Sequence, residues 1–220
     1  MVVTGAPGTG KSTICAILAR ESSMERSVHM HTDDFYHALS KGAIPPHLPE
    51  SNGQNLVVIQ AFLAAALRFA RGGYDVIVDG IVGPWFIGPW MDAARAGCPV
   101  HYIVLRAGKA QTLERAVHRD KLDRKTNLEL VEAMWGQFQD LGAYEAHVID
   151  TTRLTIPDTV RAVQAMIAQK TALLSRPAPW GRMGRGPAES GQRPGAVPYR
   201  AALSSHATVS RRVTDSSRAV

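Results

Sequence analysis

Short apolar segments alternate with longer segments in which apolar residues recur every three or four positions, over the first 170 residues of the chain. This alternation predicts a parallel sheet with helices on both faces. We expect strands at residues 1–4, 28–32, 74–79, 100–105 and 147–150. We expect helices at residues 11–20, 56–71, 109–119, 126–138 and 157–170, with a shorter one ending near residue 96.

Two stretches between these elements have their own signals. Pro45, Pro46 and Pro49 exclude a continuous helix, so residues 33–55 are expected to be irregular. Thr126-x-x-Glu129 has the spacing of a capping box, which predicts that a helix opens at this point after a polar linker over residues 120–125.

The net charge of +6 comes entirely from the end of the chain. Residues 171–220 contain eight arginines against Glu189 and Asp215, whereas residues 1–170 hold 17 basic and 17 acidic side chains. The last fifty residues are also rich in Gly, Pro, Ser and Ala, a composition that cannot bury enough apolar surface to fold. We therefore predict a domain over residues 1–170 and a disordered basic tail over 171–220, and a folded nucleic-acid-binding face is not indicated. Nonspecific attraction of the tail to RNA or anionic lipid stays open.

The overall composition is that of an ordinary globular protein, with 45% hydrophobic and 20% charged residues. Two cysteines, Cys15 and Cys98, make no disulfide framework and suit a reducing cytoplasm. No uninterrupted apolar run approaches the roughly 18 residues that span a bilayer, so we expect a cytoplasmic protein without a membrane segment.

The strongest chemical signal is an eight-residue motif that follows the first expected strand and opens the first helix. It fits G-x-x-x-x-G-K-[ST], in which glycines turn backbone N–H groups toward phosphates, the lysine reaches the β and γ oxygens, and the hydroxyl binds Mg²⁺. The other interpretation is a glycine-rich turn without a ligand. The residues expected to bind ATP here are Gly5, Ala6, Pro7, Gly8, Thr9, Gly10, Lys11, Ser12 and Thr13.

Acidic residues follow two of the expected strands. Asp33 and Asp34 come just after the second strand, and Asp79 ends the third, where carboxylates of an open α/β sheet meet the ligand. Asp79 is therefore a candidate Mg²⁺ ligand together with Ser12, although each acid is also compatible with a simple turn. Strand alternation would place His29 and His31 on one face with Asp33, a possible metal triad, but histidines near a strand end are more often packing residues.

Two arginines lie four residues apart in the expected helix 109–119. Arg115 and Arg119 therefore project from one helix face, where guanidinium groups can stack on a base or hold phosphate oxygens. A solvated surface paired with Glu114 and Asp120 is the alternative interpretation.

Together, GAPGTGKST, TDDFY, VIVDG and LERAVHR resemble the P-loop small-molecule kinases and AAA-type P-loop ATPases. The chloramphenicol phosphotransferase-like group is the most similar, and gluconate and adenylate kinases are more distant. The resemblance covers residues 1–170 and implies a three-layer α/β/α fold with strand order 2-3-1-4-5. It also implies that Asp33 acts as the base-like aspartate, that Arg115 stacks on adenine, and that Arg119 contacts phosphate. Adenylate kinases carry an acceptor-binding arginine where this chain has Gly83-Pro84-Trp85, so AMP is not the expected acceptor.

These expectations combine into a kinase that transfers the γ-phosphoryl group of ATP·Mg²⁺ to a hydroxyl of a small molecule. Lys11, Asp33 and Arg119 form the expected catalytic set, and Arg124 is an alternative to Arg119 for covering the γ-phosphate. A P-loop ATPase or nucleotide-dependent switch, and a nucleic-acid 5′-hydroxyl kinase, are the alternatives. The residues expected to contact the acceptor are Asp34, Tyr36, Asn55, Gly80 and Trp85.

Overall fold

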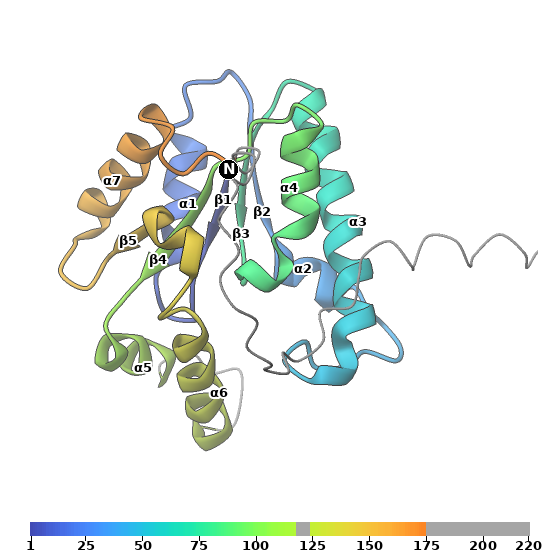
Figure 1. The fold of residues 1–220 in the computed structure, drawn as a ribbon, viewed down its shortest axis with the longest axis vertical. Helices are drawn as coiled ribbons and strands as arrows, with labels where there is room; N and C mark the ends of the chain where they lie inside the picture. The colour runs from blue at the N-terminus through green and yellow to red at the C-terminus, as the bar shows by residue number, and fades with distance from the viewer. Residues whose placement is uncertain (118–123, 175–220) are drawn as a thin grey trace, which may run out of the picture. The chain divides into compact units, whose positions relative to one another are not determined.

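The computed structural model describes residues 1–117 and 124–174, which form a five-stranded parallel sheet with the order β2-β3-β1-β4-β5 (Figure 1). This order is the one that the resemblance implied, and the three-layer α/β/α class is confirmed. The strands are β1 (Val2–Thr4), β2 (Ser27–His31), β3 (Asp75–Asp79), β4 (Tyr102–Arg106) and β5 (Val148–Asp150).

Helices cover both faces of this sheet. Figure 1 shows α1 and α7 on one side of the sheet and α3 and α4 on the other. The helices are α1 (Lys11–Arg20), α2 (Thr32–His37), α3 (Asn52–Arg71), α4 (Gly88–Arg95), α5 (Lys109–Val117), α6 (Arg124–Gln137) and α7 (Ile156–Ala168). Single turns of 3₁₀ helix lie at Pro49–Ser51 and Pro84–Phe86, and a longer 3₁₀ segment lies at Gly142–His147.

The alternation of side chains along the strands divides the core in two. Val2 and Val78 belong to the apolar cluster that includes Phe62 of α3. Val3 and Ile77, the neighbouring residues of the same strands, belong to the cluster on the α1 and α7 side. Both faces of the central strands are therefore buried, which explains their nearly continuous apolar sequences.

One helix was not expected from the sequence, and two others begin at least two residues earlier than expected. Residues 32–37 form the helix α2 instead of an irregular segment, and Asp33 and Asp34 lie in its first turn, where carboxylates favour a helix N-terminus. Helix α3 begins at Asn52 rather than at residue 56, because Pro49 starts a 3₁₀ turn that leads directly into it. Helix α6 begins at Arg124, two residues before the expected capping position Thr126.

The ordered chain continues past the expected boundary at residue 170. The backbone N–H of Tyr102 donates to Ala172 O at 2.8 Å, and the N–H of Leu174 donates to Val100 O at 2.8 Å. Ala172 and Leu174 are buried. Residues 175–220, the rest of the tail expected over 171–220, lie outside the described residues.

The segment Pro49–Arg71, which includes α3, is long and apolar enough to cross a membrane by length and composition alone. In this fold α3 places Val58, Ile59, Phe62 and Leu63 in buried positions, with Phe62 fully buried in the core. A single helix of this kind is weak evidence for a membrane span, because core helices pass the same test, and 33% of the apolar window is buried in this fold.

Candidate nucleotide-binding site

The loop between β1 and α1 has a backbone that only glycines adopt easily. Gly5, Gly8 and Gly10 have φ angles of 142°, 82° and 86°. A Cβ atom at Gly5 would lie 2.2 Å from Leu105 O, and one at Gly8 would lie 2.8 Å from Thr112 O. A Cβ at Gly10 would meet no heavy atom within 4 Å. The loop is thus fixed against the protein at Gly5 and Gly8 and open at Gly10, as a phosphate cradle requires.

The N-terminus of α1 continues this cradle. Gly10 is the N-cap residue, and no side chain caps the first turn, so its backbone N–H groups remain available to an anion. The Lys11 ammonium donates to Ala6 O at 2.9 Å, and the Thr9 hydroxyl donates to the same oxygen at 2.9 Å. Lys11 is 9% exposed. Its charge is therefore held at the loop before any phosphate binds.

Asp79 brings a buried carboxylate to the same place. It is the last residue of β3, it is 2% exposed, and it pairs in register with His31 of β2. His31 Nδ1 lies 2.5 Å from Asp79 Oδ1, and His29 Nε2 lies 3.6 Å from Asp79 Oδ2. Burial acts to raise the pKa of this carboxyl, but its interactions with His29, Ser12 and His31 outweigh burial and hold the pKa below its ordinary value.

Ser12 and Asp79 fit a hard divalent cation. Both offer oxygen atoms, which Mg²⁺ prefers, and the Ser12 hydroxyl interacts with the Asp79 carboxylate. Asp79 Oδ2 is buried and has no hydrogen-bond partner among the described residues. Such an oxygen is costly to leave unpaired, so a cation beside it would satisfy the carboxylate.

A cavity of about 340 Å³ adjoins the other side of the loop. Arg115 lines it from α5, and the Arg115 guanidinium lies 3.5 Å from Gly8 O. Leu154 and Ile156 add apolar walls although they are 37% and 51% exposed. A cavity with apolar walls and one planar cation suits a purine base. Its other lining residues are Gly8, Thr9, Gly10, Thr13, Ile14, Thr151 and Thr159.

The residues after β5 that line this cavity were not identified as site residues from the sequence. Thr151, Leu154, Ile156 and Thr159 follow Asp150, at the carboxyl edge where ligands bind in such sheets. The position of this segment after the fifth expected strand was the available signal. Its polar and apolar residues carry no motif of their own.

Asp33 and Asp34, which follow β2, lie in helix α2, whereas His29 and His31 lie in the strand itself. Because β2 ends at His31, strand alternation does not extend to Asp33, which is exposed in the first turn of α2. The suggested triad of His29, His31 and Asp33 does not form, and Asp79 lies with the two histidines instead. Burial, followed by the negative charge of Asp33, raises the pKa of Tyr36 to about 12. The charge of Asp33 therefore acts on the Tyr36 hydroxyl, and both Asp33 and Asp34 are exposed on α2.

The remaining expected acceptor residues have mixed surroundings. Asn55 Nδ2 donates to Pro46 O and to Ser51 Oγ, both at 2.8 Å, while the buried Asn55 Oδ1 has no partner among the described residues. Gly80 lies against Thr32, because a Cβ there would be 2.0 Å from Thr32 Oγ1. Trp85 is 49% exposed and meets Phe138, the residue after α6, edge-on, with ring centroids 5.6 Å apart.

The two candidate phosphate-covering arginines after α5 cannot be placed with Arg115. Arg119 lies outside the described residues. Arg124 is the first residue of α6, and nothing is described of its side chain.

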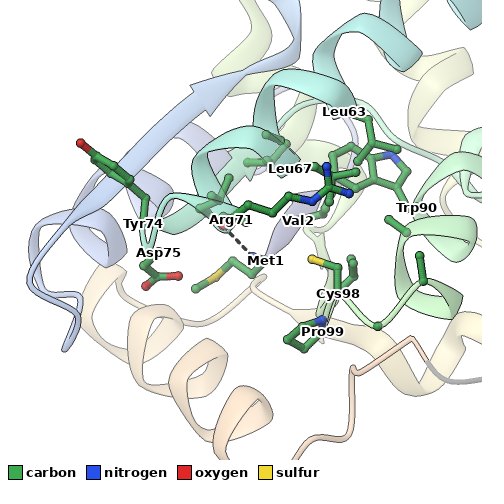
Figure 2. Close-up of a pocket in the computed structure, with 18 of the residues that line it drawn as sticks. Met1, Val2, Leu63, Leu67, Arg71, Tyr74, Asp75, Trp90, Cys98 and Pro99 are labelled. Atoms are coloured by element: carbon green, nitrogen blue, oxygen red, sulfur yellow. Dashed lines mark hydrogen bonds between the residues drawn. The ribbon is translucent and has the colours of Figure 1, made fainter.

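A second cavity, of about 450 Å³, opens at the amino ends of the strands, opposite the end that carries the phosphate loop (Figure 2). It lies where β1 and β3 begin, and Leu63, Leu67 and Trp90 contribute apolar walls. The Met1 amine donates to Val76 O at 2.6 Å beside it. Because the phosphate loop follows the carboxyl end of β1, this cavity is separate from the nucleotide-binding site.

Comparisons with known proteins agree with this geometry. A family model described as an AAA domain matches residues 1–135. A gluconokinase from Sinorhizobium meliloti 1021 is a similar solved structure, with 18% identity, a TM-score of 0.52, and coverage of 77% of this chain and 91% of that one. The tunicamycin resistance protein of Deinococcus radiodurans is similar too, with 18% identity, a TM-score of 0.54, and coverage of 76% and 94%. No curated protein sequence matches the chain.

Proposed function

The chain belongs to the AAA domain family and has the fold of the P-loop kinases, and from that premise we propose that it transfers the γ-phosphoryl group of ATP to a hydroxyl group of a small molecule. One observation supports this proposal above the others. The phosphate cradle, which is open at Gly10, lies beside Ser12, and Ser12 interacts with the buried carboxylate of Asp79. That combination provides a triphosphate site and a cation site side by side.

Positioning and charge neutralisation are the main tasks in phosphoryl transfer, because the transition state is loose and carries dispersed negative charge. The backbone N–H groups of the loop and the α1 N-terminus hold the phosphates, and Lys11 leaves Ala6 O to reach the β and γ oxygens. Ser12 and Asp79 would hold Mg²⁺, which neutralises charge on the phosphate oxygens when bound. Arg115 flanks the base cavity, and Arg119 is proposed to contact the γ-phosphate.

Asp33 is proposed to orient the acceptor hydroxyl toward the γ-phosphorus. It is exposed beyond the carboxyl end of β2, on the side of the sheet edge where the phosphate loop lies. A carboxylate there accepts a hydrogen bond from the hydroxyl and takes its proton late in the transfer. Asp34, Tyr36, Asn55, Gly80 and Trp85 remain the proposed acceptor contacts.

The names of the two similar structures suggest where a search for the acceptor should begin. One is a gluconokinase and the other is a tunicamycin resistance protein, so gluconate and tunicamycin belong in the first set of compounds tested. Two free cysteines fit a reducing compartment, and we propose that the reaction takes place in the cytoplasm.

The proposal is tested by incubating the protein with ATP, Mg²⁺ and panels of hydroxylated metabolites, nucleosides and antibiotics, and detecting phosphorylated product by mass spectrometry. Lys11→Ala should abolish transfer, because it removes the ammonium that is expected to reach the β and γ oxygens. Asp33→Asn should lower the transfer rate by about 10²–10⁴-fold, the usual range for a positioned acid–base group.

Asp34→Asn is the matched control, since it removes the neighbouring exposed carboxylate from the same helical turn. Full transfer by Asp33→Asn together with loss of transfer by Asp34→Asn would reverse the two assignments. Steady ATP hydrolysis that no hydroxyl compound alters would instead identify an ATPase or switch. Failure of the folded protein to bind ATP with Mg²⁺ in calorimetry would overturn the proposal.

A further inference from the structure

Three side chains with metal-binding atoms meet behind the phosphate loop. Cys15 of α1, His29 of β2 and Asp79 of β3 place one ligand atom each within 4.8 Å of one another. The register of the sheet explains this meeting. Within the sheet, His29 pairs with Ile77, and His31 pairs with Asp79. The side chains of these four strand residues therefore project from the face of the sheet that α1 covers, and α1 carries Cys15.

Two of these ligand atoms contact each other as an ion pair but make no hydrogen bond to the described residues. His29 Nε2 and Asp79 Oδ2 are both buried without a hydrogen-bond partner among the described residues, and the Asp79 side chain is 3% exposed. The two atoms lie 3.6 Å apart. Two ligands at the usual Zn–N and Zn–O lengths of a tetrahedral site are about 3.4 Å apart, so this separation suits a shared cation.

We propose that Cys15, His29 and Asp79 form a binding site for a thiophilic divalent cation of the Zn²⁺ class. A thiolate, an imidazole and a carboxylate are the ligands that such ions select, whereas Mg²⁺ prefers oxygen alone. The ion binds the Cys15 sulfur as the thiolate, and the thiol proton is released to solvent. Cys15 is fully buried, so the ion replaces the weak 3.9 Å contact between its sulfur and Val78 O.

The site has a consequence for the phosphate loop, and this consequence rests on the proposed function. Asp79 would be a ligand in both metal sites, and the same oxygen, the buried Oδ2 without a hydrogen-bond partner among the described residues, is the one offered to each cation, so Zn²⁺ in the Cys15 site competes with Mg²⁺ for it. Zn²⁺ should therefore inhibit nucleotide turnover reversibly, and a chelator should restore it.

The binding claim is tested without nucleotide. Zn²⁺ titration of the metal-free protein in a calorimeter should show one site per chain, and Co²⁺ should give the near-ultraviolet charge-transfer band of a thiolate ligand. Cys15→Ala should abolish this band and weaken Zn²⁺ binding by at least about 100-fold, the upper end of what loss of an outer-shell partner costs. His29→Gln should weaken binding to a similar degree.

Cys98→Ala is the matched control, because Cys98 lies at the second cavity, at the amino ends of the strands (Figure 2). It should leave Zn²⁺ affinity and the Co²⁺ band unchanged. The thermal unfolding midpoint of each metal-free variant shows whether it is folded, and His29→Gln gives a second test if Cys15→Ala is unstable.

Absence of the Co²⁺ thiolate band in the folded wild-type protein, or equal Zn²⁺ affinity in wild-type and Cys15→Ala, would overturn the site. Because these readouts need neither ATP nor an acceptor, they stand or fall separately from the kinase proposal. Zn²⁺ binding at Cys15 without inhibition of a working kinase would overturn only the competition for Asp79.

Discussion

Tyr36 reports on the position of Asp33, the residue that distinguishes transfer from simple nucleotide binding in the proposed mechanism. Burial is the larger cause and the negative charge of the Asp33 carboxylate the smaller one, and together they raise the pKa of Tyr36 to about 12. At pH 11, a tyrosine with the ordinary pKa of about 10 is mostly ionised, whereas Tyr36 should be mostly protonated.

Replacing Asp33 should therefore lower the pKa of Tyr36. We expect the ¹³Cζ signal of labelled Tyr36 to titrate at a lower pH in Asp33→Asn than in the wild-type protein, because the opposing charge is gone. Asp34→Asn should leave this titration in place. An unchanged titration in Asp33→Asn would show that Asp33 is not beside the Tyr36 hydroxyl.

At the scale of single residues, motifs with fixed spacing could be predicted and contacts between strands could not. The proposed roles of Gly8, Gly10 and Lys11 follow from one continuous motif, and the structure places the Lys11 ammonium 2.9 Å from Ala6 O in the same loop. The contacts of His29 and His31 with Asp79 depend on the register of β2 against β3, which no local pattern specifies. Without that register, strand alternation alone associated the histidines with Asp33.

At the scale of elements, the start of α7 links stability to the base cavity. Thr155 caps the helix, since the N–H of Asp158 donates to Thr155 Oγ1 at 3.2 Å and the Asp158 carboxylate accepts from the Thr155 N–H at 3.3 Å. Leu154 and Ile156, on either side of Thr155, line the cavity beside Arg115. The cap therefore fixes two walls of the proposed adenine site.

Thr155→Ala should lower the free energy of unfolding by about 1 kcal/mol, the usual cost of losing an N-cap side chain. It should also weaken ATP binding, because the walls at residues 154 and 156 lose their anchor. Thr155→Ser keeps the hydroxyl and should restore both properties. Urea denaturation and calorimetric ATP titration measure the two effects, and equal stability of the alanine and serine variants would contradict the role of the cap.

The strands and long helices were predictable because their apolar periodicity extends over whole elements. Helix α2 was missed because its six residues, Thr32–His37, are too few to show a period. The early start of α3 was hidden by Pro49, which reads as a helix breaker in the sequence but occupies the first position of a turn that a proline tolerates.

At the scale of the whole molecule, the alternation of strands and helices predicted the layers but not the order of the strands. A central β1 between β3 and β4 was expected only from the resemblance to P-loop kinases. This order places the phosphate loop between the carboxyl ends of β3 and β4, so that Asp79 and Leu105 flank it from either side. The apolar cavity at the amino ends of the strands had no sequence signal, because its walls are ordinary core residues.

The end of the folded domain can be located by comparing two truncations. A chain ending at Leu174 loses all eight tail arginines and has no net charge, but it keeps Ala172 and Leu174 in their buried positions. We expect its thermal midpoint and ATP affinity to equal those of the full chain. Any salt-dependent binding of oligonucleotides by the full chain should disappear in it, because the excess positive charge of the chain lies in the deleted residues.

A chain ending at Lys170 also has no net charge, yet it lacks the hydrogen bonds from Tyr102 to Ala172 and from Leu174 to Val100. Loss of one buried leucine costs about 1.5–3 kcal/mol, and each hydrogen bond adds about 0.5–1.5 kcal/mol. Its unfolding midpoint in urea should therefore fall clearly below that of the chain ending at Leu174. Equal midpoints would place the end of the stable domain at residue 170, and a lower midpoint for the chain ending at Leu174 than for the full chain would show that residues beyond 174 stabilise the fold.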